Sequence, residues 1–514
     1  MTGGKYLQGM LNAVSSVRGV AVFFILYGVV NAVITRAAGP ALALDDVKLN
    51  VLTQSWRGGY LPENPPLFEW MLIAVQGLAG PALASFLIVK YAFLTLTGVF
   101  TFLAARAIMD DARWAGLTAL SLLLIYQIGS NYHQAFTHST ALIMAAALFW
   151  FALVNVIRTR TIPAYALLGL AVGLGVLAKY SFLASAGLGL VACLTTLQGR
   201  RALAAPGAVL SLAIAAAICA PHVFWLMADN TAVAQEAGAR LAGSGAPHWR
   251  RALAGLPAAV WAVIAFFLPL ALVLAAAFPG LVSQLRADPE TEDCGAALVQ
   301  RATLLGAGAL IAAVVIFGID NMQERYAIAF MYPGLFWLML AARRAASERA
   351  ITRYAAIVVA VVAAMASLRV IEAVVAGPPF CDQCRQWVPY ENLGRTVSQL
   401  DIDGATLVGF EDHTAGNLRR LFPSTRVLSA HMPFYTPQGW ADGDKCYFIW
   451  SDQLGPPAPE HVTGAVDPDH VWTVDAPWRG PFRKDGWRVT RWTIAEFSHR
   501  PGIARSLCRP DVLR

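Results

Sequence analysis

Residues 20–46 read VAVFFILYGVVNAVITRAAGPALALDD, an apolar run that is followed by two adjacent acids, Asp45 and Asp46. The part from Val20 to Ala38 approaches the roughly 20 apolar residues that a helix needs to cross a bilayer. Basic residues precede this run, but it is long and has no convincing small-residue cleavage site. We therefore expect a retained membrane helix rather than a signal peptide, with the acids just beyond its outer end.

The composition extends this expectation to most of the chain. Of the 514 residues, 57% are hydrophobic and 14% are charged, whereas about 25% are charged in an average soluble protein. An ordinary soluble enzyme is therefore excluded, which leaves a transporter, a channel, a receptor or a membrane enzyme. Further apolar runs cover 83–105, 141–157, 208–226, 258–278, 304–317 and 355–368.

Basic residues alternate between the predicted loops, as expected if they collect on the cytoplasmic side. This side is marked by residues 5, 18, 106, 113, 158, 160, 200, 201, 286, 301, 343, 344, 349 and 353. The pattern predicts a cytoplasmic N-terminus and about 11–13 membrane crossings. The net charge of +7 is then explained by membrane orientation, and nucleic acid is not an expected partner.

The predicted outer face carries short loops and one larger domain. The loops are 39–82, 131–137, 179–183, 227–252 and 319–325, and within the first of them Pro66 to Gly80 predicts a short helix lying at the membrane surface. The composition changes after Ala376, so we expect a membrane domain over 1–376 and a soluble α/β domain over 377–514, facing the periplasm.

The soluble domain shows strand and helix patterns in order. Strands are expected over 405–410, 426–428, 445–450 and 487–494, with a helix over 415–421. We expect this domain to shape the acceptor cleft or to dock partner proteins. No internal repeat is evident, which weighs against transporters built from inverted repeats.

Four of the cysteines fall in this outer domain: Cys381, Cys384, Cys446 and Cys508. An even number in an oxidising compartment predicts structural disulfides, with the pairing left open. Half of a zinc site or a redox pair at Cys381 and Cys384 is the alternative, but no second CxxC follows.

The first outer loop holds the residues that point most directly to chemistry. After Asp45 and Asp46 it continues as WRGGYLPENPPL over residues 56–67. Two adjacent acids at a membrane edge are often only a solvated helix cap. Here the surrounding residues favour a different interpretation.

The acid pair, the aromatic helix after it and the Gly-Tyr and Pro-Pro-Leu pieces resemble the first periplasmic loop of one glycosyltransferase family. It contains protein O-mannosyltransferases, lipid A aminoarabinose transferases and rhizobial lipopolysaccharide sugar transferases. Matching pieces follow in the same order along nearly the whole chain: LAKYS at 177–181, residues 221–225 with Asn230, ERY at 324–326 before Pro333, and AGNLR at 415–419.

The resemblance implies a GT-C fold, a polytopic helical membrane domain with its active site at the outer face. It also implies a sugar donor linked to polyprenyl phosphate. In such enzymes the first acid of the pair is the proposed catalytic base, a role that falls on Asp45, and Asp46 would position the acceptor or raise the pKa of its neighbour. Inversion at the anomeric carbon is implied by analogy only.

Two cations are candidates for binding the departing phosphate, Lys179 and Arg325. A snorkelling lysine and an arginine that only bridges to Glu324 are the structural alternatives. The arginines at 240, 250 and 251 are better explained as a solvated loop.

Acceptor or sugar contacts are expected from the outer loops. The candidates are Tyr60, Glu63, Asn64, His138, Tyr180 and Glu324. His138 stands where many members of the family have an acid, and it would bind the acceptor, share proton transfer or only cap a helix. Asn64 stands where relatives often have His or Lys. His133 and His222 are weaker candidates.

Cofactors are not expected. Asp45, Asp46, Glu63 and His138 are the only plausible metal ligands, and their spacing matches no known metal motif, although a divalent cation is not excluded. The chain has no phosphate-binding loop and no dinucleotide-binding motif.

The sequence therefore predicts an inner-membrane glycosyltransferase that moves a sugar from a polyprenyl-phosphate carrier to a glycan or glycolipid such as lipopolysaccharide. A transporter or flippase for a lipid-linked substrate is the alternative from another class, but it would place charges deep within the spans, and apart from Lys90 these are nearly uncharged. An inactive relative that scaffolds an envelope assembly is a third interpretation.

Overall fold

The computed structural model of the protein describes residues 2–134, 136–228, 247–286, 294–320, 322–375, 384–439, 445–452, 468–484 and 486–498. Its contacts divide the chain into two compact units, which we describe separately. The helical unit comprises residues 1–29, 61–67 and 90–366, and the sheet unit comprises residues 30–60, 68–89 and 367–514. The predicted functional division into residues 1–376 and 377–514 remains a prediction.

Helices account for the described part of the helical unit, because a helix satisfies its own backbone hydrogen bonds and can therefore lie in a bilayer. Helices α2 and α5 contribute residues to both units. The longer helices are α1 (Thr2–Val14), α2 (Val17–Ala38), α5 (Leu83–Met109), α6 (Ala112–Ser121), α8 (His138–Thr159), α9 (Ile162–Ala178), α10 (Phe182–Leu194), α12 (Gly207–Ala228), α14 (His248–Ala277), α16 (Cys294–Phe317), α18 (Pro333–Arg344) and α19 (Glu348–Val370).

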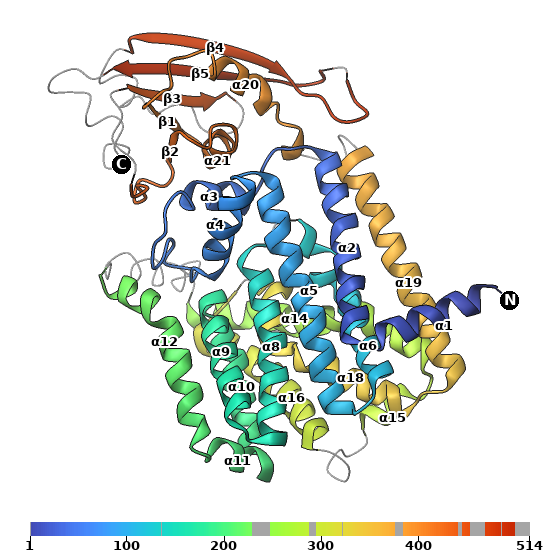
Figure 1. The fold of residues 1–514 in the computed structure, drawn as a ribbon. Helices are drawn as coiled ribbons and strands as arrows, with labels where there is room; N and C mark the ends of the chain where they lie inside the picture. The colour runs from blue at the N-terminus through green and yellow to red at the C-terminus, as the bar shows by residue number, and fades with distance from the viewer. Residues whose placement is uncertain are drawn as a thin grey trace. The chain divides into compact units, whose positions relative to one another are not determined.

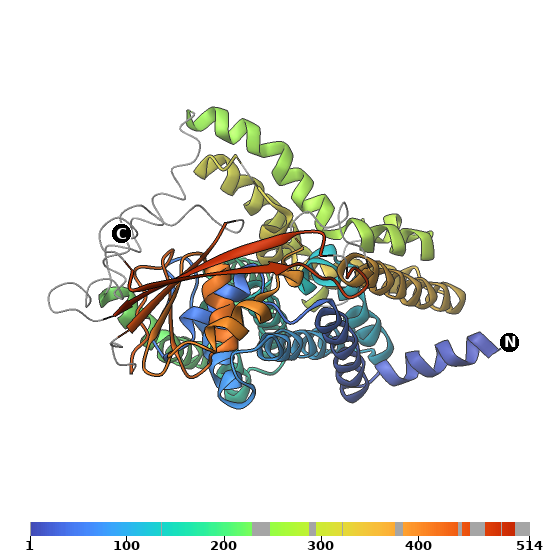
Figure 2. The same cartoon turned by 90° about the horizontal axis from the view of Figure 1, so that it is seen from above.

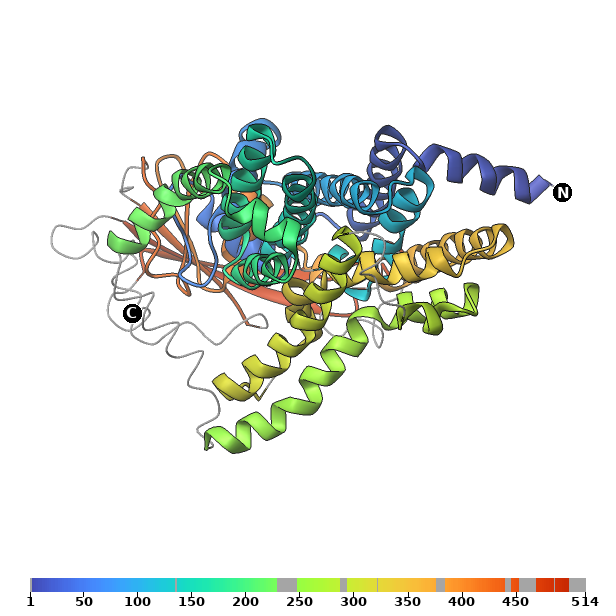
Figure 3. The same cartoon turned by 90° about the horizontal axis from the view of Figure 1, so that it is seen from below.

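Short helical turns connect these elements. They are α7 (Tyr126–Gly129), α11 (Leu197–Leu203), α15 (Leu281–Leu285), α17 (Ile328–Met331), the 3-10 turns η1 (Leu122–Leu124), η2 (Asn131–His133) and η4 (Glu324–Ala327), and, in the sheet unit, the π-helical turn η5 (Ile371–Val375) and the 3-10 turn η6 (Arg385–Trp387). Within the helical unit, α9 packs between α8 and α12 (Figure 1). Figure 3 shows these helices from below.

The predicted fold class is confirmed by the number and length of the apolar helices. In the part of the chain that the structure describes, seven helices are long and apolar enough to cross a membrane, or up to nine if each of two bent helix pairs is one span. Shorter apolar helices cover Leu67–Ala79, Ala112–Leu124 and Ile162–Ala178. The lower end of the predicted range of about 11–13 crossings would require the last two to cross as well.

The sheet unit contains a five-stranded mixed sheet in the order β2-β1-β3-β5-β4. Strand β1 pairs in parallel with β2 and β3, whereas β5 pairs antiparallel with β3 and β4. Figure 2 shows the long strands β4 and β5 running side by side. The strands are β1 (Thr406–Gly409), β2 (Arg426–Ser429), β3 (Lys445–Ser451), β4 (His470–Pro477) and β5 (Val489–Ser498).

The sequence predicted four of these strands and helix α21 (Asp412–Leu421), but it did not predict β4. As the last strand in the order, β4 is an edge strand, and most of its side chains are exposed or half-buried. The main signal for a strand in a sequence is the alternation of apolar and polar residues. A strand at the edge of a sheet buries fewer side chains, so this alternation can be weak. Buried residues of the sheet form one apolar cluster: Val408, Leu428, Cys446, Phe448, Ala495 and Phe497.

Three further helices belong to the sheet unit: α3 (Asp45–Leu52), most of α4 (Leu67–Ala79) and α20 (Tyr390–Val397). Helix α21 packs against β1 and β2 and also against α3 (Figure 1). Residues 39–60 and 68–82 of the first outer loop therefore fold together with the C-terminal sheet, although more than 300 residues separate them in the sequence.

The cysteines of the sheet unit are oxidised where they are described. Cys384 and Cys446 are each disulfide-bonded. Cys381 and Cys508 lie outside the described residues, so the pairing stays open. In the helical unit, Cys193 and Cys219 are described and form no disulfide bond.

Close contacts between helices in the helical unit predict how glycine substitutions in α16 affect stability. A Cβ added to Gly306 would lie 2.3 Å from the carbonyl oxygen of Phe330, whereas a Cβ added to Gly308 would have no atom within 4 Å. We expect Gly306→Ala to lower the free energy of unfolding by about 1–3 kcal/mol, because the rigid backbone of α17 must shift. Gly308→Ala on the same helix is the matched control and should be neutral or slightly stabilising. Thermal unfolding of both variants in detergent tests this, and equal midpoints would contradict it.

Candidate active site

The two adjacent acids begin helix α3 and differ in exposure. Asp45 is exposed, whereas Asp46 is only 7% exposed. A carboxylate in the first turn of a helix is stabilised by the partial positive charge of the helix N-terminus. The arrangement leaves one of the two acids, Asp45, exposed to solvent.

Backbone strain lies immediately before the acids. Leu44 adopts φ 56° and ψ −131°, a conformation that side-chain-bearing residues rarely adopt. Strain of this kind costs about 1–3 kcal/mol and persists only where the surrounding structure enforces it. Contacts from outside α3 must therefore hold the residues that precede this helix.

The loop after α3 is closed by Tyr60. Its hydroxyl accepts a hydrogen bond from the Arg57 N–H at 3.0 Å and donates one to the Ser55 carbonyl oxygen at 2.9 Å. Burial raises the pKa of Tyr60 well above its ordinary value. The hydroxyl is therefore a neutral group that shapes the loop, and its predicted contact with a sugar or acceptor remains a prediction.

Arg57 anchors the same loop within the sheet unit, a role that the sequence analysis missed. Its guanidinium lies over the Tyr435 ring, 4.8 Å from the centroid, and donates to the Thr436 carbonyl oxygen. The Arg57 carbonyl oxygen accepts a hydrogen bond of 2.8 Å from the Trp70 indole. The signal in the sequence was an arginine within an otherwise glycine-rich and aromatic segment.

In the helical unit, Lys179 directly follows α9. Its ammonium group donates to the Ser139 hydroxyl at 3.2 Å. The partial negative charge of the helix C-terminus favours a positive charge and so stabilises a lysine at this position.

Tyr180, the next residue, belongs to an aromatic stack. Its hydroxyl shares a hydrogen bond of 2.8 Å with His222 Nε2. The His222 ring stacks on the Trp225 ring, with 5.7 Å between the ring centroids. Burial, and to a lesser extent the negative charge of Glu63, raise the pKa of Tyr180 to about 12. The structure therefore brings Glu63 and Tyr180 near each other, and it adds His222 and Trp225 to this group.

Glu324 and Arg325 line a polar pocket of about 270 Å³. Arg325 also lies over the Tyr326 ring, 5.4 Å from its centroid. The remaining lining residues supply amide groups and one aromatic ring: Gln127, Asn131, Gln134, Phe136 and Gln323. Amides and a guanidinium suit sugar hydroxyl and phosphate oxygens, because they present several donors with fixed geometry.

The amides of this pocket were missed in the sequence analysis, although Asn131 and Gln134 stand in the predicted second outer loop. The loop is held by His133, whose two ring nitrogens share hydrogen bonds with Tyr27 at 2.8 Å and Tyr91 at 3.1 Å. This arrangement assigns His133 a structural role.

The remaining candidates have local partners. His138 is the first residue of α8, is buried, and shares a hydrogen bond of 3.2 Å with the Thr137 hydroxyl. The backbone N–H of Asn64 donates to the Leu61 carbonyl oxygen at 3.4 Å. Their roles in binding stay predictions. Arg240 lies outside the described residues.

Metal ligands do not cluster in the described parts of the chain: no group of three or more His, Cys, Asp or Glu side chains could hold an ion there. The candidate catalytic acids Asp45 and Asp46 belong to the sheet unit, and the candidate cations Lys179 and Arg325 belong to the helical unit.

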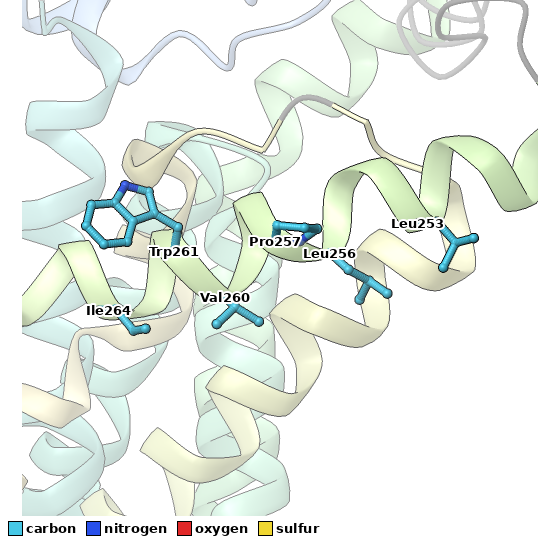
Figure 4. A pocket seen from close by; sticks show the side chains of 6 residues that line it. All are labelled: Leu253, Leu256, Pro257, Val260, Trp261 and Ile264. Carbon is cyan, nitrogen blue, oxygen red and sulfur yellow. The ribbon is translucent and has the colours of Figure 1, made fainter.

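An open apolar groove of about 590 Å³ runs along α14. Figure 4 shows the side chains that line it, which come from successive turns of this one helix: Leu253, Leu256, Pro257, Val260, Trp261 and Ile264. It contains no titratable group, so it has the chemistry of a hydrocarbon-contacting surface rather than of a catalytic site.

Comparisons with known proteins agree with this description. The family model described as dolichyl-phosphate-mannose-protein mannosyltransferase matches residues 63–225. The lipopolysaccharide core galacturonosyltransferase RgtB of Rhizobium johnstonii is 26% identical over 421 residues, which cover 80% of this chain and 83% of that protein. The galacturonosyltransferase RgtA of the same organism is 25% identical over 428 residues, 82% and 84% of the two chains.

Solved structures show a similar fold. The crystal structure of ArnT from Cupriavidus metallidurans bound to undecaprenyl phosphate matches with a TM-score of 0.60 and 16% identity, over 93% of this chain and 98% of that one. The same protein in the apo state matches with a TM-score of 0.56 and 16% identity, over 92% and 97%. The predicted family resemblance and the GT-C fold are therefore confirmed.

If Arg57 anchors the first loop, its substitution should lower the stability of the sheet unit. Arg57→Lys keeps the charge but loses the planar group that lies over Tyr435, so we expect it to destabilise the sheet unit by roughly 1–2 kcal/mol. Arg395→Lys is the control, because this exposed arginine donates to Asn392 three residues before it. Thermal unfolding of both variants measures the difference, and an Arg57→Lys midpoint equal to that of the control would refute the anchoring role.

Proposed function

We propose that this chain, a membrane glycosyltransferase of the GT-C type, transfers a monosaccharide from a polyprenyl-phosphate carrier to a glycan or glycolipid acceptor such as lipopolysaccharide. That the chain is a glycosyltransferase follows from its family match and from its curated relatives. The names of those relatives support the proposed acceptor, and ArnT bound to undecaprenyl phosphate supports the proposed carrier. The transporter alternative has no comparable support.

The exposed Asp45 is the observation that carries the proposed mechanism. As the acceptor oxygen forms a bond to the anomeric carbon, the bond from that carbon to the phosphate oxygen breaks. Asp45 takes the proton of the acceptor hydroxyl, and polyprenyl phosphate leaves with its negative charge. Attack opposite to the leaving phosphate inverts the configuration at the anomeric carbon. Asp46, buried beside the base, positions α3 and the acceptor.

Cations complete the proposed chemistry. Lys179 and Arg325 bind the carrier phosphate and stabilise the charge that develops on it. The amides around Arg325 donate to sugar hydroxyl groups, and Tyr180 and Glu63 contact the sugar or acceptor. The curated relatives are named for galacturonic acid, so a polyprenyl-phosphate galacturonosyl donor is the first substrate to test.

We further propose that the reaction takes place at the periplasmic face of the inner membrane. The basic residues that alternate between predicted loops support a cytoplasmic N-terminus and a periplasmic C-terminal domain. The disulfide bonds of Cys384 and Cys446 agree with an oxidising compartment.

The role of Asp45 is tested by Asp45→Asn. Purified protein is incubated with radiolabelled polyprenyl-phosphate sugar and lipopolysaccharide, and the labelled product is measured. Loss of the base should lower kcat by about 10²–10⁴-fold, because the amide cannot accept the proton. Asp403→Asn, at an exposed acid of the sheet unit, is the control and should keep wild-type activity. Equal product from wild type and Asp45→Asn would show that another group is the base.

Orientation is tested with alkaline phosphatase fusions, since this reporter forms its disulfides only in the periplasm. A fusion after Val375, at the end of the last helical turn before the C-terminal domain, should be active. A fusion after Ala345, between α18 and α19, should be inactive. The opposite pattern would invert the proposed topology.

A further inference from the structure

Helices α3 and α21 approach each other closely at Gly416. A Cβ at this position would lie 2.4 Å from the carbonyl oxygen and 2.6 Å from the Cα of Val47. Both atoms belong to the backbone of α3 and cannot move aside as a flexible side chain would. Only glycine at position 416 lets α21 of the C-terminal domain lie this close to α3.

Asn417, the next residue, pairs with the chain just before the acids. Its side-chain oxygen accepts from the Leu42 N–H at 3.0 Å, and its amide nitrogen donates to the Leu42 carbonyl oxygen at 3.1 Å. Asn417 is fully buried. Both backbone groups of Leu42 are thus satisfied by one side chain, close to the strained Leu44 and to Asp45.

Two more amides connect the same elements. The Asn50 amide donates to the carbonyl oxygens of Gly416 at 2.8 Å and Pro81 at 3.1 Å, and its oxygen accepts from Gln76 at 2.9 Å. Asn50 is fully buried, so these bonds satisfy its polar atoms away from water. It joins α3 to α21 and α4.

Gln54 repeats the two-bond pairing after the end of α3. Its amide donates to the Val427 carbonyl oxygen at 2.7 Å, and its oxygen accepts from the Val427 N–H at 3.0 Å. Strand β2 is thereby tied to the residues that follow α3.

We infer that the C-terminal domain holds the catalytic acid in place, and that Asn417, Asn50 and Gln54 are positioning residues for Asp45. The inference rests on the proposed function, in which Asp45 is the base. A helix of eight residues is not stable alone in water, and the strained Leu44 requires an external restraint. The domain that was expected to shape an acceptor cleft thus also supplies part of the active centre's framework.

The test separates positioning from folding by measuring kcat and the donor KM of purified variants. Asn417→Asp keeps the acceptor for the Leu42 N–H but loses the donor to its carbonyl oxygen. Gly416→Ala forces α3 away from α21. A displacement of about 1 Å costs on the order of 10²-fold in rate, so kcat should fall at least about 10-fold in both variants. The donor KM should stay within about threefold, because Lys179 and Arg325 belong to the other unit.

Matched controls exist for both changes. Gly77→Ala, on α4 of the same unit, adds a Cβ with no atom within 4 Å. Asn392→Asp changes an amide whose oxygen accepts a hydrogen bond from the nearby Arg395. Both controls should keep kcat within about twofold of wild type, since neither touches α3.

Each outcome is decisive. Wild-type kcat in Asn417→Asp and Gly416→Ala, with Asp45→Asn inactive, overturns the positioning role and leaves the proposed function intact. Activity of Asp45→Asn overturns the assignment of the base itself. If the two variants do not accumulate as folded protein, Gln54→Ala at a half-buried position replaces them, and the same kcat and KM criteria apply.

Discussion

Leu42 and Asn417 are 375 positions apart in the chain, and one buried side-chain amide satisfies both backbone polar groups of Leu42. A buried N–H or carbonyl without a partner costs about 1–3 kcal/mol, so the segment before the acids has a defined conformation only when α21 is present. This pairing fixes the start of α3 against α21. The close contact at Gly416 and the amides of Asn50 and Gln54 extend it along the whole of α3.

Different constraints act on the helical unit. Its apolar helices satisfy the backbone internally, and specific contacts between them come from small residues and buried hydroxyl groups. Gly306 lets α16 approach α17, and Thr101 and Tyr332 share a buried hydrogen bond of 2.7 Å. These contacts hold α17 and Tyr332, which follow the turn η4 that carries Arg325.

The candidate residues were predictable to different degrees. Asp45, Lys179 and Arg325 were noticed because charges at the ends of apolar helices are costly and therefore conspicuous. The sequence analysis missed the amides of Gln127, Asn131 and Gln134, because amide side chains are common in loops. They line a pocket only where the chain folds to bring them close to Glu324 and Arg325. Asn417 lay in a recognised motif, but its function could not be read, because its partner is the backbone of a residue that has no polar side chain.

Sequence by itself determined the membrane-spanning class, the GT-C fold and most of the C-terminal secondary structure. The membrane-spanning class and the secondary structure depend on hydrophobic length and on periodicity, which are local in the chain. The GT-C fold was implied by the resemblance of the ordered loop motifs to a known family. Only the tertiary structure decided which acid is exposed, which amides line the pocket and which element holds α3. Those features depend on pairs of residues that are distant in sequence, and burial and hydrogen bonding at such pairs exist only after the chain has folded.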